Sequence, residues 1–328
     1  LLNYLDVDQP EWITATTLEK AKEFALNVNY PIIVRPSYVL SGAAMKTIWN
    51  EKELERFLNE ATCLSPDHPV VLSKFILNAK EVEVDGVADK GKVVIEAITE
   101  HVENAGVHSG DATLVIPPQR LYLETIRQTK KITRKIVQSL QITGPFNIQF
   151  IASDNAVKVI ECNLRASRSF PFISKVTNHN FIEIATKVLV GKHQYQPYET
   201  LELDYVGIKS PQFSYSRLKG ANPVANVEMA STGEVACIGD NYFDAFYKSW
   251  LASEKRIKNK NILFSIGGKE KKKKLLEAIR ILEEQGWNIY CTEGTHDFLY
   301  RNGIASTFLY KTSIAQEPNV QTAILNKN

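Results

Sequence analysis

The spacing of apolar and polar residues divides the first two thirds of the chain into helices, strands and hairpins. Two short apolar runs predict strands, at 30–37 and 68–76. Alternation of apolar and polar residues predicts two hairpins, over 80–102 and 146–162. Amphipathic helices are predicted wherever apolar residues recur with the helical repeat, which happens over 16–28, 50–62, 123–140 and 181–191.

The last third of the chain has a different pattern. Residues 192–224 are richer in Tyr, Pro and Gln, and we expect them to be irregular. A helix is predicted over 243–252. From residue 261 onward apolar strands and polar helices alternate as βαβαβ, which predicts a small parallel sheet. A domain boundary is therefore predicted near 256–260.

Composition is typical of a globular intracellular protein. The chain has 328 residues, of which 44% are apolar and 23% charged, and the length favours about two domains. A net charge of +2 gives no electrostatic reason to expect a nucleic-acid or membrane partner. No apolar run approaches the ~20 residues that span a bilayer. The four cysteines form no CxxC pair, so we expect reduced thiols. The start at Leu1 favours a fragment or processed product.

Polar groups gather at the end of one predicted strand, in the stretch VKVIECNLRASRSF (157–170). Strict alternation puts Glu161 and Asn163 on the same face as Val157 and Val159. Gln149 lies on the partner strand of the same hairpin. A carboxylate and two amides from neighbouring strands would then meet at one edge of the sheet.

The turn of this hairpin decides whether Gln149 faces Glu161. Their pairing requires a three-residue turn at 154–156. A two-residue turn at 154–155 would instead place Gln149 opposite Ile160, on the wrong face. We therefore predict the three-residue turn.

With that register, three oxygen ligands converge from adjacent strands. Such ligands suit Mg²⁺ or Mn²⁺, which commonly share the phosphate oxygens of a nucleotide. Arg165 and Arg168 follow the strand and can hold phosphate oxygens as a fork. The alternative is a polar strand end with a surface ion pair.

A loop rich in glycine occurs in EHVENAGVHSGDATLV (100–115). Gly106, Ser109 and Gly110 would let backbone N–H groups approach phosphates. The spacing is not that of a Walker P-loop, and no helix follows as in a dinucleotide fold. A plain turn is the alternative, and His108 taken alone is more typical of a structural hydrogen bond.

Two further segments complete the pattern. In IIVRPSYVLSGAAM (32–45), Arg35 ends a strand and the small residues 41–44 predict a mobile flap. In VVLSKFILNAKEVEVD (70–85), a strand backbone can bond a nucleobase edge, and Glu81, seven residues after Lys74, can accept ribose hydroxyls.

In this order the four clusters resemble an ATP-grasp domain. The segments VRPSYVLSGAAM, GPFNIQF and VIECNLRASRSFPFISK are similar to the second, carbamate-phosphorylating half of the carbamoyl-phosphate synthetase large subunit. The resemblance covers essentially all 328 residues. The resemblance implies an α/β (α+β) ATP-grasp fold, followed by a partial Rossmann-like parallel domain of the methylglyoxal-synthase type. The implied bounds are 1–200 for the ATP-grasp domain without its preceding subdomain, 201–258 for the end of the synthetase region and a linker, and 259–328 for the partial regulatory domain.

The resemblance also implies a role for each site residue, with ATP and Mg²⁺ or Mn²⁺ as cofactors. It assigns the metals to Gln149, Glu161 and Asn163, and phosphate to Arg35. It assigns the carbamate or the transferred phosphoryl group to Arg165 and Arg168. The nucleotide pocket comprises Gly106, Val107, His108 and Ser109, with Lys74, Ile76 and Glu81 at its adenine and ribose end.

The implied partners are the remaining parts of a synthetase. They are a first ATP-grasp half that makes carbamate from bicarbonate, and a glutaminase domain or subunit or another source of ammonia. The hairpin 80–102 and the flap 38–46 would form a lid that excludes water from unstable carbamate. An anionic effector is implied at Thr292 and Thr295, for which helix capping is the alternative. The implied compartment is the cytoplasm or the mitochondrial matrix.

Two other functions compete with this interpretation. The first is another ATP-grasp ligase, such as a biotin carboxylase. The second is a nucleotide- or effector-binding module that is catalytically incomplete. The absence of a Ser/His/Asp or Cys/His signature is consistent with phosphoryl transfer, which needs no side-chain nucleophile.

Overall fold

The computed structural model describes residues 1–36, 45–64, 69–192, 202–214, 227, 229–253 and 259–326. Most of the flap predicted at 38–46 lies outside these residues, as does much of 192–224. The chain divides into two compact units, Leu1–Lys255 and Arg256–Asn328, and each is described by itself.

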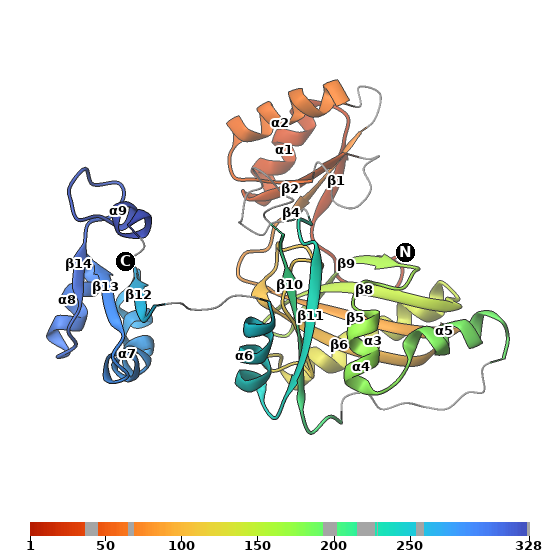
Figure 1. The fold of residues 1–328 in the computed structure, drawn as a ribbon. Coiled ribbons are helices and arrows are strands. Elements are labelled where there is room, and N and C mark those ends of the chain that lie inside the picture. Colours follow the sequence, from red (N-terminus) through yellow and green to blue (C-terminus); the bar gives the residue numbers. More distant parts are fainter. Residues whose placement is uncertain are drawn as a thin grey trace. The chain divides into compact units, whose positions relative to one another are not determined.

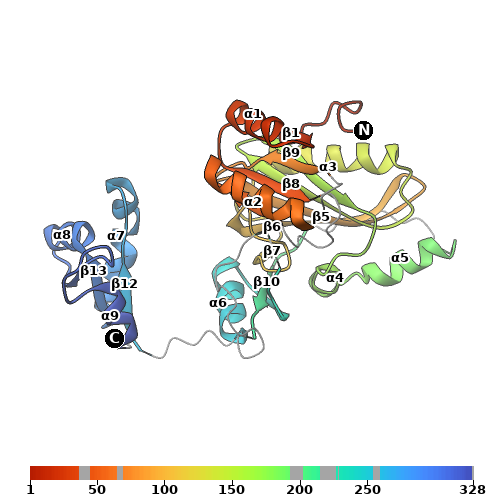
Figure 2. The same cartoon turned by 90° about the horizontal axis from the view of Figure 1, so that it is seen from above.

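A small antiparallel sheet with two helices forms the first part of unit 1. Helices α1 (Leu18–Val28) and α2 (Glu51–Leu64) lie side by side on this sheet (Figures 1 and 2). As predicted, a polar residue caps each helix, since Thr17 Oγ1 accepts from Lys20 N and Asn50 Oδ1 from Glu53 N. The strands pair in the order β1 (Trp12–Ala15), β4 (Val70–Lys74), β2 (Ile32–Pro36) and β3 (Lys46–Ile48).

The larger sheet of unit 1, called the central sheet below, is antiparallel throughout its described strands. Residues 206–212 form one of these strands, so the irregular structure predicted for 192–224 is wrong there. The missed strand pairs on both sides, which a single-sequence pattern does not reveal. The order is β11 (Gly233–Gly239), β10 (Val206–Gln212), β7 (Leu114–Ile116), β6 (Lys92–Asn104), β5 (Lys80–Asp89), β8 (Gly144–Ser153) and β9 (Ala156–Asn163).

Helices cover both faces of the central sheet. The predicted helix α3 (Leu123–Ser139) packs on one face through Ile136 and Val137. Figure 2 shows the helices α4 (Phe170–Thr177) and α5 (Phe181–Leu189) on the other side of β5, β6 and β8. Helix α6 (Tyr242–Ala252) packs on β10 and β11. The part of the α4 and α5 face that these helices leave free carries the polar residues described below.

In the β8–β9 hairpin the predicted pair of Gln149 and Glu161 is present, but the predicted three-residue turn is wrong. The turn has only two residues, Asp154 and Asn155, because Ser153 pairs with Ala156. An irregularity between Gln149 and Phe150 then leaves Ile160 without a partner in the ladder, and Gln149 still pairs with Glu161.

The same β-bulge also changes the faces of the hairpin. Val157 and Val159 pack in the apolar core under α3, and beyond the bulge Cys162 packs there as well. Glu161 and Asn163 therefore lie on the opposite face. The prediction that they share a face with the two valines is wrong, because the extra residue shifts the alternation by one position.

Unit 2 has the predicted βαβαβ order. Its strands pair in parallel in the order β12, β13, β14. Within the described part of the chain no helix is long and apolar enough to cross a membrane. The elements of unit 2 are β12 (Asn261–Phe264), α7 (Lys269–Glu284), β13 (Asn288–Thr292), α8 (Glu293–Arg301), β14 (Thr307–Leu309) and α9 (Val320–Leu325).

Candidate active site

A row of polar side chains crosses three neighbouring strands of the central sheet. Gln149 on β8 pairs with Glu161 on β9 and with Glu83 on β5. One step along the strands, Asn147 pairs with Asn163 and with Asp85. Since directly paired residues project on the same side of a sheet, all of these side chains share one face.

Hydrogen bonds connect the members of this row. Asn163 Nδ2 donates to Glu161 Oε1 at 2.7 Å, and Asn147 Nδ2 donates to Asp85 Oδ1 at 2.9 Å. Gln149 Nε2 lies 3.4 Å from Ser109 Oγ. That contact brings the glycine-rich loop to the predicted ligands Gln149, Glu161 and Asn163.

The glycine-rich loop is held close to the polar row from several sides. Gly106 has φ +112°, and a Cβ there would come within 2.7 Å of the Phe75 ring. His108 Nδ1 accepts from Gly110 N at 3.0 Å, which is the local structural role considered above for this histidine. The buried ammonium group of Lys209 on β10 donates to the Ser109 carbonyl oxygen at 3.1 Å. Val107 packs against the core under α4 and α5.

A buried ionisable cluster adjoins the row, and we did not predict most of it. His101 Nε2 lies 3.1 Å from Glu83 Oε1, and His101 Nδ1 lies 3.9 Å from Glu81 Oε2. The sequence does carry a signal, because EVEVD in β5 places Glu81, Glu83 and Asp85 on one face. Such alternation is also typical of a strand whose polar face meets water, so the sequence alone does not show that these side chains are buried.

Burial and charge shift the pKa values of this cluster in different directions. Burial raises the pKa of Glu81 to about 7. Burial, with the charge of Glu83, raises the pKa of Asp85 to about 7. Burial also opposes the charged forms of Glu83 and His101, but their mutual hydrogen bond and opposite charges lower the pKa of Glu83 and raise that of His101.

The ligand atoms of Glu81, Glu83 and His101 lie within 4.8 Å of one another, as in some metal sites. All three side chains are buried, and His101 Nε2 already lies 3.1 Å from Glu83 Oε1. We therefore interpret this cluster as a hydrogen-bonded ion pair with a neighbouring carboxyl group. The oxygen donors of Gln149, Glu161 and Asn163 fit Mg²⁺ or Mn²⁺ better, because they are hard and incompletely buried.

The remaining predicted residues follow β9 or lie on and after strands of the small sheet. Arg165 and Arg168 follow β9 and are exposed, and Arg168 Nη1 lies 3.4 Å from Ser231 Oγ. Arg35 lies on the small sheet, on β2, and is also exposed. Lys74 Nζ donates to the Asn29 carbonyl oxygen at 2.8 Å. Ile76 follows β4 and is half-buried.

The predicted effector residues lie where parallel strands end in unit 2. Thr292 ends β13 and occupies the N-cap position of α8, but its hydroxyl donates to Ser265 Oγ at 3.1 Å instead of capping the helix. Thr295 Oγ1 accepts from Ile266 N at 3.0 Å. Both hydroxyls therefore join β13 and α8 to the segment after β12.

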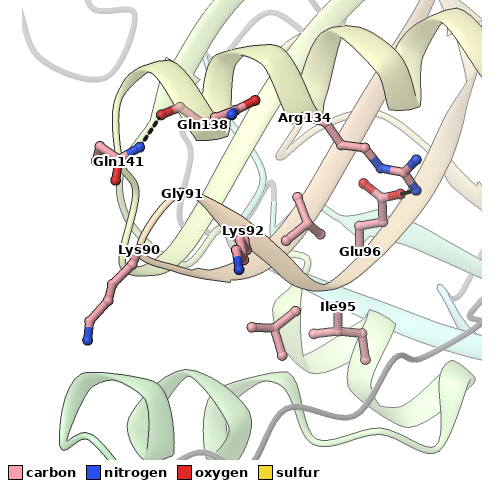
Figure 3. Close-up of a pocket in the computed structure, with 10 residues that line it drawn as sticks. Lys90, Gly91, Lys92, Ile95, Glu96, Arg134, Gln138 and Gln141 are labelled. Carbon is pink, nitrogen blue, oxygen red and sulfur yellow. Dashed lines mark hydrogen bonds and ion pairs between the residues drawn. The ribbon is translucent and has the colours of Figure 1, made fainter.

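A separate cavity of about 570 Å³ opens at the turn of the β5–β6 hairpin, beside the end of α3. Figure 3 shows the Arg134 guanidinium facing the Glu96 carboxylate, with Gln138 and Gln141 joined by a hydrogen bond. None of the polar-row residues lines it. This cavity lies nearer the turn of the hairpin than the candidate site does.

Solved structures with the same architecture define the class of fold. Unit 1 has the ATP-grasp fold. Biotin carboxylase from Campylobacter jejuni, solved as a β,γ-ATP complex, matches with a TM-score of 0.61 and 19% identity, over 75% of this chain and 62% of that one. An N5-carboxyaminoimidazole ribonucleotide synthetase solved with ADP gives a TM-score of 0.59 and 14% identity, over 77% and 70%. At these identities the likeness concerns the fold alone.

Sequence comparison identifies the family. Residues 3–196 match the carbamoyl-phosphate synthase L chain ATP-binding domain, and residues 274–328 match the MGS-like domain. The first match covers more than half of the chain, which therefore belongs to the carbamoyl-phosphate synthase large-chain family.

Two curated relatives illustrate the match. The chain is 53% identical over 310 residues to the multifunctional protein URA2 of Saccharomyces cerevisiae, with 94% of this chain and 14% of the relative covered. It is 48% identical over 313 residues to the mitochondrial ammonia-dependent carbamoyl-phosphate synthase of Rattus norvegicus, with 94% and 21% covered. The chain thus spans between a seventh and about a fifth of these relatives.

Proposed function

We propose that this chain transfers the γ-phosphoryl group of ATP to carbamate and so forms carbamoyl phosphate and ADP, as the second ATP-grasp half of a longer carbamoyl-phosphate synthetase. The observation that carries the proposal is the pairing of Gln149 with Glu161, beside a glycine-rich loop that reaches Gln149 through Ser109. This arrangement combines metal ligands with backbone donors, as phosphoryl transfer requires.

In this reaction a carbamate oxygen attacks the γ-phosphorus, and the bond to the β,γ-bridging oxygen breaks as ADP leaves. The protein provides position and charge compensation, not a covalent intermediate. Backbone N–H groups of 106–109 bind the phosphates, together with the guanidinium of Arg35. Arg165 and Arg168 bind the carbamate and the transferred group. Lys74, Ile76 and Glu81 hold the adenine and ribose.

Gln149, Glu161 and Asn163 are the residues that would hold Mg²⁺ or Mn²⁺. When bound, the metal neutralises negative charge on the transferring phosphate oxygens. The hydrogen bond from Asn163 to Glu161 orients both side chains before any ligand arrives. That orientation supports a preformed site.

The reverse half-reaction tests the proposal directly. The natural full-length enzyme that contains this chain should form ATP from MgADP and carbamoyl phosphate. No ATP formation, together with bicarbonate-dependent carboxylation of biotin, would identify the chain as a biotin carboxylase instead. Binding of MgATP with no turnover in either assay would support the catalytically incomplete module.

Isothermal titration calorimetry with MgATP isolates the role of Glu161. We expect Glu161→Gln to weaken MgATP binding roughly 10- to 100-fold, because the metal loses a charged ligand. Asp154→Asn is the matched control. It removes a carboxylate from the same hairpin at φ +52°, which asparagine tolerates, and should bind as the unmodified chain does. Equal affinity in both variants would exclude Glu161 from the metal site.

The proposed partners follow from the reaction. A first ATP-grasp half must supply carbamate, and a glutaminase domain or subunit, or free ammonia, must supply nitrogen. Residues Thr292 and Thr295 in unit 2 are proposed to contact an anionic effector. The cytoplasm and the mitochondrial matrix are the two proposed compartments, according to whether the parent is of the multifunctional or the ammonia-dependent type.

A further inference from the structure

Residues 229–231 follow the ATP-grasp region in sequence and are hydrogen-bonded to the glycine-rich loop. The Asp111 carboxylate accepts two hydrogen bonds from consecutive backbone groups, at 2.7 Å from Ala230 N and 2.9 Å from Ser231 N. In return, Ser231 Oγ donates to the Gly110 carbonyl oxygen at 3.1 Å. Asp111 and Ser231 are both buried, so these bonds are shielded from water.

The same segment also contacts Arg168. The guanidinium of Arg168 donates to Ser231 Oγ at 3.4 Å and contacts the sulfur atom of Met229. Loop, segment and arginine meet closely at Gly110, because a Cβ at that position would lie 2.6 Å from the Met229 sulfur and 3.0 Å from Arg168 Nη1. A larger residue there would have to displace the Met229 and Arg168 side chains.

We propose that Asp111 and Ser231 are positioning residues that fix the glycine-rich loop and Arg168 relative to each other through segment 229–231. The inference rests on the proposed phosphoryl transfer. The loop would bind the phosphates of ATP, and Arg168 would bind the group that receives or carries the phosphoryl. Their separation sets the alignment of donor and acceptor, to which such transfers are sensitive.

A charged carboxylate suits this role for a physical reason. Hydrogen bonds from backbone N–H groups to an ionised acceptor are about twice as strong as neutral ones. Two of them on adjacent residues fix both the position and the direction of segment 229–231. Ser231 then uses its one hydroxyl as a donor to the loop and as an acceptor from Arg168.

The test measures ATP formation from MgADP and carbamoyl phosphate in the full-length enzyme, expressed per nucleotide-binding site. Asp111→Asn keeps the shape of the side chain but turns one acceptor into a donor facing an N–H group. We expect kcat/KM for carbamoyl phosphate to fall roughly 10- to 100-fold, with a raised KM for carbamoyl phosphate, because Arg168 moves. Ser231→Ala should change both in the same direction, by roughly 2- to 10-fold.

Thr232→Ala is the matched control. Its hydroxyl donates to the Gln212 carbonyl oxygen, away from the loop and from Arg168, and its loss should leave the kinetics unchanged. A reduced kcat per site with unchanged KM in both Asp111→Asn and Ser231→Ala would overturn the proposal. If Asp111→Asn does not fold, Ser231→Ala alone decides. If the unmodified enzyme makes no ATP, the proposed function has failed, and not only this inference.

Discussion

The β5–β6 hairpin buries carboxylates on both faces of the central sheet, and Glu83 and Glu96 are stabilised in different ways. At the candidate site, Glu83 is hydrogen-bonded to His101, which is completely buried and comes from the neighbouring strand. Near the turn, Glu96 lies 3.6 Å from Arg134, whose side chain is 67% exposed (Figure 3). One pair is fixed inside the protein, and the other reaches into solvent.

The difference between the two ion pairs affects the pKa values of their carboxyl groups. Water screens an exposed guanidinium, so the pair near the turn contributes little, and burial still raises the pKa of Glu96. His101, the partner of Glu83, is completely buried and cannot move into solvent. Its hydrogen bond and charge therefore keep the pKa of Glu83 lowered despite complete burial. At the phosphate site proposed above, such a fixed charge pattern would need no reorganisation on binding.

The largest effect should follow from removing the buried partner. Glu83→Ala leaves His101 in the interior without its hydrogen-bonded carboxylate, and we expect a loss of roughly 3–5 kcal/mol in the free energy of unfolding. Urea denaturation at pH 7 measures it. Glu83→Gln keeps an acceptor oxygen and should cost less. A loss below about 1 kcal/mol for Glu83→Ala would show that the pair is no more important than an exposed one.

A smaller effect should appear as a pH dependence. Glu81 and Asp85 have pKa values raised to about 7 in the folded chain, above their values in the unfolded chain. The folded state therefore binds more protons, and the stability that these groups provide is lost as the pH rises through 7. Between pH 6 and 8 we expect the free energy of unfolding to fall by about 1 kcal/mol per carboxyl group.

Asp85→Asn tests this assignment and should remove about half of that decrease. Asp154→Asn, at the exposed hairpin turn, should leave the decrease unchanged. If stability instead rises from pH 6 to 8, the two buried carboxyls do not have raised pKa values.

The smallest effect is expected at the Glu96–Arg134 pair. Arg134→Ala removes the exposed partner of Glu96 and should change the free energy of unfolding by no more than about 1 kcal/mol. The rate of ATP formation should not change, because none of the polar-row residues lines the cavity near the turn. A loss comparable to that of Glu83→Ala would mean that the exposed ion pair stabilises the fold as much as the buried one.

Periodicity alone was a good guide wherever an element follows one local pattern. The predicted α1, α2, α3, α5 and α6 are all present, as is the βαβαβ order of unit 2. The β8–β9 hairpin was harder to predict, because Val157, Val159, Glu161 and Asn163 alternate perfectly in the sequence. The bulge at Ile160 puts the valines and the polar pair on opposite faces of the sheet. Whether a bulge forms depends on how both faces pack, which the local pattern does not show.

The sequence by itself determined which residue types are present: oxygen donors at the end of one strand, a glycine-rich loop, and the arginines after β9. Those features are local in the chain, so the residue types alone indicate their chemistry. Only the tertiary structure decided that Glu83 and His101 form a buried pair and that Asp111 fastens the loop to residues 229–231. Those partners are far apart in sequence or lie on neighbouring strands, and burial, which makes their charges matter, is a property of the folded sheet.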